Sequence, residues 1–148
     1  MMIKIICVGN LKEEYLIEAS TEYIKRLQSY TKLKIIEMPD QKENLIIESN
    51  KIMEKINKKD YLILLDINGK QYDSEELSKK IEDLFLYGDS NITFIIGGST
   101  GVSDELKEIC NEIISFSKLT FPHQLFRIIF LEQLYRCFKI MKNETYHK

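Results

Sequence analysis

Tyr61-Leu62-Ile63-Leu64-Leu65-Asp66 is an uninterrupted apolar run that ends in a carboxylate, and Ile92-Thr93-Phe94-Ile95-Ile96 is a second buried run. Runs without the alternation of a half-exposed strand are typical of strands buried on both faces of a parallel sheet. Working outward, strands are also predicted at Met2–Val8, Leu33–Met38 and Ile113–Phe116, and helices at Glu14–Tyr30, Leu45–Ile56, Ser74–Tyr87, after Ser103, and from Pro122 to about Met141. Strands that alternate with helices predict an α/β fold with a mostly parallel sheet flanked by helices.

Local signals mark the ends of these elements. Asn68-Gly69 is predicted to form a turn, and Gly88-Asp89 is predicted to end the third helix. Ser74 and Ser103 each precede two acidic residues, so both are predicted to be helix N-caps. No linker, repeat or low-complexity tract divides the chain, and residues 1–148 are therefore expected to form a single domain.

Composition narrows the class of protein. With 44% hydrophobic and 30% charged residues, the chain is an ordinary globular sequence, and it has no apolar run long enough to span a membrane. Cys7, Cys110 and Cys137 are scattered without metal-ligand spacing. They are expected to be small buried hydrophobic residues in a reducing cytoplasm, with no metal site.

Charge is distributed unevenly along the chain. Residues 117–148 hold six of the 21 Lys and Arg residues but only two of the 23 Asp and Glu residues. An acidic body with a basic C-terminal segment suggests one surface that faces a polyanion. A solvated last helix with Lys near its C-terminus explains the same pattern, and the charge alone leaves both interpretations open.

The last predicted helix is apolar nearly all round, whereas a surface helix needs only one apolar stripe. A helix of this kind is buried on more than one side. We therefore predict a homodimer across this helix, with burial inside a single chain as the alternative. Arg127 and Arg136 lie on this helix and are expected to pair with buried carboxylates or with a ligand's phosphate.

Three predicted strand ends carry turn-forming residues: Leu65-Asp66, the loop Gly97-Gly98-Ser99-Thr100-Gly101, and Ser117–Pro122. Ligands usually bind at the carboxyl ends of parallel strands, and glycines let a ligand approach the backbone. The glycine spacing matches neither a Rossmann nor a Walker loop. A cleft with few charges favours an adenosine-like ligand, and a larger residue at position 98 is expected to enter the adenosine site.

Two histidines are candidates for acid–base chemistry. His123 follows Pro122 and either acts in catalysis or only binds groups at the start of the helix. His147 is next to the C-terminus, where it has little to pack against, so a functional role is favoured for it.

Together these blocks resemble the H-type family of ribosomal large-subunit pseudouridine N3-methyltransferases, a group of SPOUT (α/β-knot) methyltransferases. The resemblance covers nearly the whole chain and is strongest in five blocks: Leu65-Asp66 with Gly69-Lys70, Ile95-Ile96-Gly97-Gly98 with Gly101, Ser117–His123, Glu132–Arg136, and Tyr146-His147-Lys148. The segment after Met38 is shorter than is usual in the family.

The resemblance implies a C-terminal trefoil knot, an obligate homodimer and S-adenosylmethionine (S-adenosyl-L-methionine) as cofactor. The cofactor-binding residues that it implies are Leu65, Gly98, Ser117, Lys118, Leu119, Thr120, Phe121 and Pro122. The implied substrate is a pseudouridine of large-subunit (23S) rRNA in the assembled ribosome, methylated at N3. Tyr146, His147 and Arg136 are expected to be catalytic, donated by the second subunit. Two alternatives remain: a SPOUT methyltransferase acting on tRNA, and a non-catalytic α/β dimer that binds a ribosome or small ligand.

Overall fold

The computed structural model describes residues 2–42, 44–88 and 91–148, and these form an α/β fold. The elements in chain order are β1 (Met2–Val8), α1 (Glu14–Leu27), β2 (Lys32–Met38), α2 (Leu45–Lys55), β3 (Tyr61–Gln71), α3 (Ser74–Tyr87), β4 (Ile92–Ile96), α4 (Asp104–Ile109), β5 (Glu112–Ser115) and α5 (His123–Met141). The five strands form one sheet in the order β2-β1-β4-β3-β5, and every strand pair is parallel. The predicted α/β fold with a parallel sheet flanked by helices is thus confirmed.

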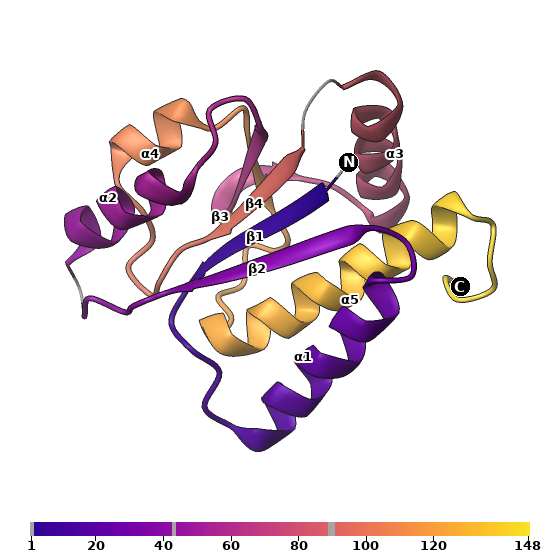
Figure 1. Ribbon diagram of the computed structural model, residues 1–148, viewed down its shortest axis with the longest axis horizontal. Coiled ribbons are helices and arrows are strands. Elements are labelled where there is room, and N and C mark those ends of the chain that lie inside the picture. The colour runs from indigo at the N-terminus through magenta and orange to yellow at the C-terminus, as the bar shows by residue number, and fades with distance from the viewer. Residues whose placement is uncertain (1, 43, 89–90) are drawn as a thin grey trace.

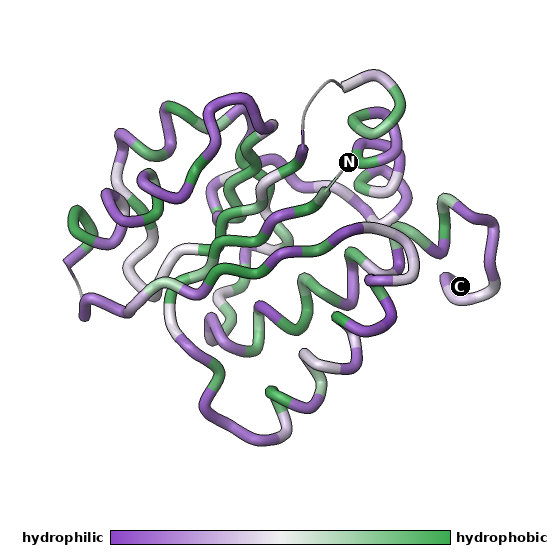
Figure 2. The backbone as a smooth tube through the Cα atoms, in the orientation of Figure 1, coloured by the Kyte–Doolittle hydropathy of each residue, from purple (hydrophilic) through white to green (hydrophobic). Residues whose placement is uncertain are grey.

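The helices cover both faces of the sheet. Figure 1 shows α2 and α4 on one face and α1, α3 and α5 on the other. Side chains of β1 alternate between the two cores: Ile3, Ile5 and Cys7 pack with the α1–α3–α5 layer, whereas Ile6 and Val8 pack with the α2–α4 layer. The hydropathy colouring in Figure 2 accordingly shows the central strands as the most continuous hydrophobic part of the chain.

The chain itself covers much of α5. Phe130 packs against Phe94 of β4 with ring centroids 4.8 Å apart, and Phe138 lies between Tyr30, at 5.6 Å, and Phe85 of α3, at 5.9 Å. The helix therefore lies between the sheet and two other helices, which accounts for its buried residues on more than one side. A second subunit on its remaining surface stays a prediction.

Strand β3 is longer than predicted. Asn68-Gly69 lies within it rather than in a turn, because residues 70–71 pair with β5 after an irregularity that follows Leu65. A Cβ at Gly69 would lie 2.6 Å from the backbone of Ile113, so only glycine allows this close approach. The local turn signal is overridden by pairing with a strand about forty residues later.

The helix termini follow the predicted chemistry with one correction. Asp73, not Ser74, is the N-cap of α3: its carboxylate accepts the Glu76 N–H at 2.7 Å, and its own N–H donates to the Glu76 carboxylate at 2.9 Å. Ser103 is confirmed as the N-cap of α4. Gly88 ends α3, and the adjoining predicted position Asp89 lies outside the described residues.

Candidate active site

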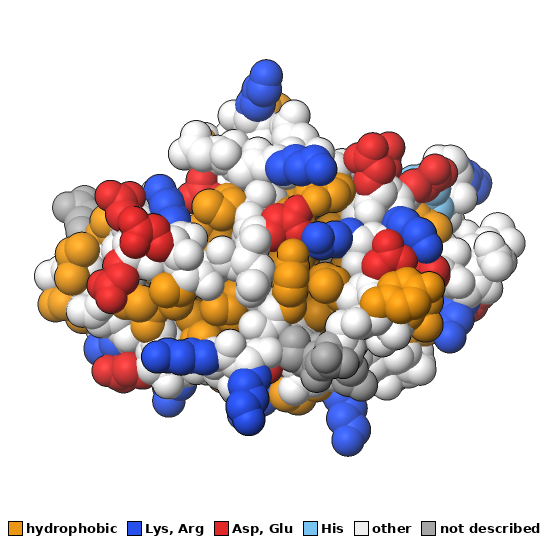
Figure 3. All heavy atoms as spheres, turned by 90° about the horizontal axis from the view of Figure 1, so that it is seen from above, with side chains coloured by type: hydrophobic (Ala, Val, Ile, Leu, Met, Phe, Trp, Pro, Cys, Tyr) orange, Lys and Arg blue, Asp and Glu red, His pale blue; other side chains and the backbone are white. Residues whose placement is uncertain are grey.

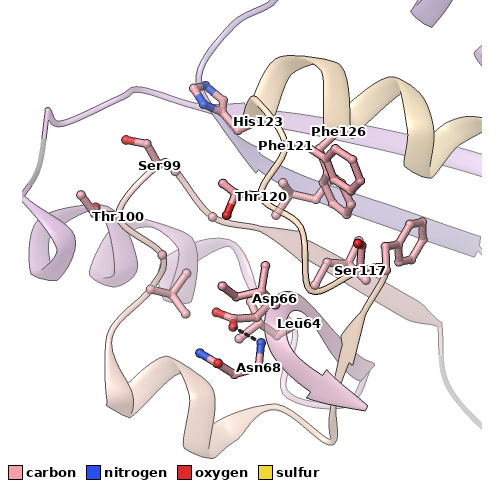
Figure 4. A pocket seen from close by; sticks show the side chains of 18 of the residues that line it. Leu64, Asp66, Asn68, Ser99, Thr100, Ser117, Thr120, Phe121, His123 and Phe126 are labelled. Atoms are coloured by element: carbon pink, nitrogen blue, oxygen red, sulfur yellow. Dashed lines mark hydrogen bonds between the residues drawn. The ribbon is translucent and has the colours of Figure 1, made fainter. Parts of the chain in front are cut away.

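A cavity of about 740 Å³ lies at the carboxyl ends of β3, β4 and β5. Three segments form most of its wall: the end of β3, the loop of residues 97–102 after β4, and residues 116–123, which lead from β5 into α5 (Figure 4). Lys107 of α4 and Phe126 of α5 complete it. Its residues are Leu64, Leu65, Asp66, Ile67, Asn68, Ile96, Gly97, Gly98, Ser99, Thr100, Gly101, Val102, Lys107, Phe116, Ser117, Leu119, Thr120, Phe121, Pro122, His123 and Phe126. The three strand ends that sequence analysis singled out therefore meet in one cavity.

The glycine loop folds back on itself. Gly101 N–H donates to the Gly98 carbonyl at 3.1 Å, and Gly101 has φ +83°, a conformation that L side chains rarely adopt. A Cβ at Gly98 would meet Glu48 Oε1 at 3.0 Å and Val8 Cγ1 at 3.3 Å. The expectation that a larger residue at position 98 enters the adenosine site therefore needs correction, because its first carbon would contact residues behind the loop.

The segment of residues 116–122 is held by its own hydrogen bonds. Leu119 N–H donates to Ser117 Oγ at 2.9 Å, and Ser115 Oγ donates to the Ser117 carbonyl at 3.0 Å. The rings of Phe116 and Phe121 both pack against Phe126, with centroids 5.2 Å and 6.3 Å away. Aromatic packing thus fixes the segment on the first turns of α5.

Seven of the eight residues assigned to the cofactor line this cavity: Leu65, Gly98, Ser117, Leu119, Thr120, Phe121 and Pro122. Lys118 is exposed and is not part of the wall, so its assignment remains a prediction with no geometric support. Asn68, Val102 and Phe126 were not anticipated. Asn68 belongs to the predicted Asn68-Gly69 turn, and the other two are apolar or aromatic residues indistinguishable from core residues in the sequence.

Among the described residues, the ionisable side chains of the cavity wall are Asp66, Lys107 and His123. Asp66 is oriented by the Asn68 N–H, which donates to its Oδ1 at 2.9 Å (Figure 4). The remaining wall is backbone, hydroxyl and apolar carbon. No group of three or more His, Cys, Asp or Glu residues within the described ranges could hold a metal ion.

The C-terminal tail packs on the last turns of α5. Arg136 Nη1 lies 3.1 Å from His147 Nδ1, and the guanidinium lies 4.8 Å from the centroid of the Tyr146 ring. Glu132 links them: its Oε1 accepts from Arg136 Nε at 3.0 Å and from the Tyr146 hydroxyl at 3.3 Å. Burial, together with the Glu132 charge, raises the pKa of Tyr146 to about 12. The three predicted catalytic residues therefore form one cluster.

This cluster and the cavity lie at opposite ends of α5. His123 begins the helix at the cavity, and Arg136 is thirteen residues further along, about 20 Å at the rise of an α-helix. None of Arg136, Tyr146 and His147 lines the cavity. Figure 1 shows the C-terminus beside the last turns of the helix, at the end away from His123. Within one chain, the two groups of predicted site residues do not meet.

The arginines of α5 pair with carboxylates, as one interpretation of the sequence predicted, but these carboxylates are not buried: Glu37 is exposed and Glu132 is half-buried. Arg127, 3% exposed, contacts Glu37 at 2.6 Å and donates to the Gly9 carbonyl at 2.7 Å. Arg136 pairs with Glu132. Lys139 also forms an ion pair, with Glu144 at 2.9 Å, so half of the cations in residues 117–148 have acidic partners within the chain.

The burial predicted for the three cysteines is found for two of them. Cys7 and Cys137 are buried and Cys110 is half-buried, and all three are free. None of the described helices is long and apolar enough to cross a membrane.

Comparison with known proteins identifies the family. The profile of a family described as predicted SPOUT methyltransferase matches residues 1–147. Proteins named ribosomal RNA large subunit methyltransferase H are 52% identical in Enterococcus faecalis, 48% in Streptococcus uberis and 50% in Clostridium perfringens, with all of both chains covered. These alignments span 159 positions against 148 residues here, which fits a shortened segment. The resemblance noted in the sequence is confirmed: this chain belongs to the SPOUT methyltransferase family.

Proposed function

We propose that this chain transfers a methyl group from S-adenosylmethionine to N3 of a pseudouridine in large-subunit rRNA, within the assembled ribosome. The observation that carries the proposal is the cavity at the ends of β3, β4 and β5, walled by the glycine loop and residues 116–122. The names of the relatives support the substrate class, since all are ribosomal RNA large subunit methyltransferases. The finer assignment to pseudouridine N3 follows from the family resemblance.

The cavity fits the proposed cofactor. Its volume of about 740 Å³ is within the range of small-molecule sites. Backbone amides of the glycine loop and the apolar side chains of Leu65 and Phe121 suit an adenosine, and Asp66 is the carboxylate of the wall, suited to a cationic group. The bound cofactor would supply a methyl group activated by a sulfonium. Leu65, Gly98 and Ser117–Pro122 would hold it.

We further infer a homodimer in which each active site is composite. One protomer would provide the cavity, and its partner would provide Arg136, Tyr146 and His147, because these residues lie about 20 Å along α5 from the cavity of their own chain. Half-buried apolar residues remain on α5 for a partner to cover, including Ile129 and Ile140. Alignment of two bound reactants would then be the main source of rate enhancement.

The tail residues suit different tasks in this site. The phenol of Tyr146, whose pKa is raised to about 12, stays protonated and directs its proton at Glu132, so its oxygen would accept a hydrogen bond that orients the base. His147 would accept the N3 proton as the nitrogen forms its bond to the methyl carbon and the carbon–sulfur bond breaks. Arg136 would hold both side chains in place through its contacts with the Tyr146 ring and the His147 ring.

We also propose that residues 1–148 form a single domain with a trefoil knot at its C-terminal end, as in the family. The pairing of β3 with both β4 and β5 supports it, as does the close packing of Gly69 on the β5 backbone. Such a topology is rare among proteins. An experimental structure traced continuously from Leu65 to Met141 tests the crossing of the chain.

Tritiated methyl transfer tests the activity. Purified protein, labelled cofactor and three acceptors are combined: whole ribosomes, free rRNA and tRNA. Incorporation into rRNA of whole ribosomes, mapped by mass spectrometry to a pseudouridine, is the expected result. Labelling of tRNA alone supports the other methyltransferase class, and cofactor binding without any incorporation supports a binding protein.

Deletion of residues 146–148 tests the role of the C-terminal tail independently of the cofactor cavity. Turnover is expected to be lost while calorimetry shows unchanged cofactor affinity, because the tail lies away from the cofactor cavity. Full turnover after this deletion would exclude the tail from catalysis.

A further inference from the structure

Glu48 has a buried carboxyl oxygen that lacks a hydrogen-bond partner within the described part of the chain. It lies in the first turns of α2, and only 3% of its surface is exposed. Its Oε2 accepts the Gln41 N–H at 2.8 Å, but its Oε1 is buried without a hydrogen-bond partner among the described residues. Among the described residues, it is the only buried side-chain nitrogen or oxygen that lacks a hydrogen-bond partner. Buried polar atoms are nearly always paired, so this exception needs an explanation.

The Glu48 carboxyl lies directly behind the wall of the cofactor cavity. The position of a Cβ on Gly98 is 3.0 Å from Glu48 Oε1 and 3.6 Å from Oε2, so the carboxyl occupies the side of Gly98 where a side chain would lie. The next residue, Ser49, is completely buried, and its Oγ accepts the Ser103 N–H at 2.8 Å. Two consecutive residues of α2 therefore lie against Gly98 in the glycine loop and against Ser103, which follows the loop.

Other ionisable groups face Glu48 from several elements. Asp40, in the segment after β2, and His123, at the start of α5, both influence the pKa of Glu48. Lys12, between β1 and α1, acts on Asp40. Burial and the neighbouring Asp40 raise the pKa of Glu48, whereas the Lys42 N–H and the hydrogen bond with Glu48 lower the pKa of Asp40. Of the two carboxyls, Glu48 is therefore the weaker acid and the one that takes up a proton first.

Protonation of Glu48 would give its unpaired oxygen a hydrogen-bonding role. As a carboxylate, Glu48 has only acceptors, and Oε1 finds no donor. As a carboxylic acid, it can donate a hydrogen bond to Asp40 while Oε2 keeps the Gln41 N–H. Ionisation would leave a buried charge against the backbone of the glycine loop, a costly state that displacement of the loop relieves.

We propose that Glu48 is a positioning residue of the cofactor site: its buried carboxyl, held by the Gln41 N–H and placed directly behind Gly98, fixes the glycine loop in the conformation that binds the cofactor. The inference rests on the proposed function, since it concerns the same cavity. Helix α2 contributes no residue to the cavity wall. Under this proposal it nevertheless controls the position of that wall.

Calorimetry with two ligands tests this role. S-adenosylmethionine and S-adenosylhomocysteine are titrated into the wild type, E48Q, E48A and the control E54Q, which removes an exposed charge from the same helix. E48A is expected to weaken both ligands about tenfold, the effect of losing one buried hydrogen-bonded support. E48Q, which resembles the neutral acid, and E54Q should bind like the wild type at low pH.

The pH profile separates positioning from a general structural effect. Wild-type affinity for both ligands is expected to fall as pH rises through the raised pKa of Glu48, and E48Q should lose this component, so that it binds several-fold more tightly than the wild type at high pH. This comparison remains informative even if E48A does not fold.

Two results would overturn the proposal. Equal affinities and parallel pH profiles for the wild type and E48Q would remove Glu48 from the cofactor site. A pH effect confined to S-adenosylmethionine would identify a counter-charge for the sulfonium instead of a support for the loop, because the homocysteine product lacks that charge. Failure of the wild type to bind either ligand would instead contradict the proposed function itself.

Discussion

At the residue scale, Gly98 and Gly101 differ in what a side chain would meet. A Cβ at Gly98 would be crowded by Glu48 and Val8, whereas at Gly101 nothing lies within 4 Å but φ is +83°. Gly98→Ala is therefore expected to weaken cofactor affinity about tenfold by displacing the loop. Gly101→Ala should cost about 1 kcal/mol of folding free energy through backbone strain. Calorimetry and urea unfolding measure the two effects, and equal behaviour of the two variants would contradict this distinction.

The thiols provide a second prediction at this scale. Burial raises the pKa of Cys7 and of Cys110 to about 11 and that of Cys137 to about 12. Since only the thiolate reacts, the native protein should react slowly with a disulfide reagent at pH 8, and guanidinium chloride should expose three equivalents. Rapid labelling of any thiol in the native state would contradict the packing described for it.

Glu48 also predicts a pH dependence of stability. Its folded-state pKa is raised above the unfolded value by burial, so its neutral form stabilises the fold at pH below the unfolded pKa. This contribution is lost as pH rises through the folded pKa. E48Q, which cannot ionise, should therefore gain stability relative to the wild type with rising pH in urea unfolding. A constant difference between the two proteins across the range would count against a protonated Glu48.

At the scale of secondary-structure elements, the cap of α3 gives the clearest test. Asp73→Ala removes the acceptor for the Glu76 N–H, which is expected to cost about 1 kcal/mol. For a chain of this size, the melting temperature should fall by about 2–4 °C. Asp73→Asn keeps a side-chain acceptor and is the matched control. An unchanged melting temperature for both variants would show that the capping box contributes little.

Most elements could be predicted from sequence because their signals are local. The buried runs of β3 and β4 and the Ser103 cap of α4 all lie where the pattern of residues places them. The extension of β3 to Gln71 could not be found in this way, since it depends on pairing with β5. Ser74 was mistaken for the cap because Asp and Ser are equally good N-caps, and its hydroxyl instead donates to Gln133 at 2.6 Å.

The candidate site was predictable to a similar degree. The predicted ends of the strands located the cavity correctly, because the carboxyl ends of parallel strands meet at a common edge of the sheet. The support from Glu48 was not predictable, since a glutamate on an amphipathic helix is normally solvent-exposed. The apolar character of α5 predicted burial on several sides but did not distinguish between α1, α3 and a second subunit as the covering surface.

At the scale of the whole molecule, the composite site predicts complementation between two inactive variants. Gly98→Val, defective in the cofactor loop, is mixed with the protein lacking residues 146–148 under conditions that exchange subunits. Half of the dimers would be mixed and each would hold one complete site, so about a quarter of wild-type activity should return. A mixture no more active than its components would show that each subunit works alone.

The distribution of charge on the molecular surface indicates which kind of RNA partner the protein binds. The face in Figure 3 shows acidic and basic side chains interspersed with hydrophobic ones. A formal net charge of −2 also disfavours indiscriminate binding to polyanions. A large structured partner recognised by shape, as proposed for the ribosome, fits this surface better than binding to any exposed RNA.

The nineteen residues of α5 connect the cavity to the tail without interruption. In the proposed dimer this rigid helix acts as a molecular spacer, because its length sets how far a tail extends toward the neighbouring cofactor. One inserted turn would shift the tail by about 5.4 Å, enough to separate the reacting groups. Changes in chain length among relatives are therefore expected in loops such as the one after Met38, while this helix keeps a constant number of residues.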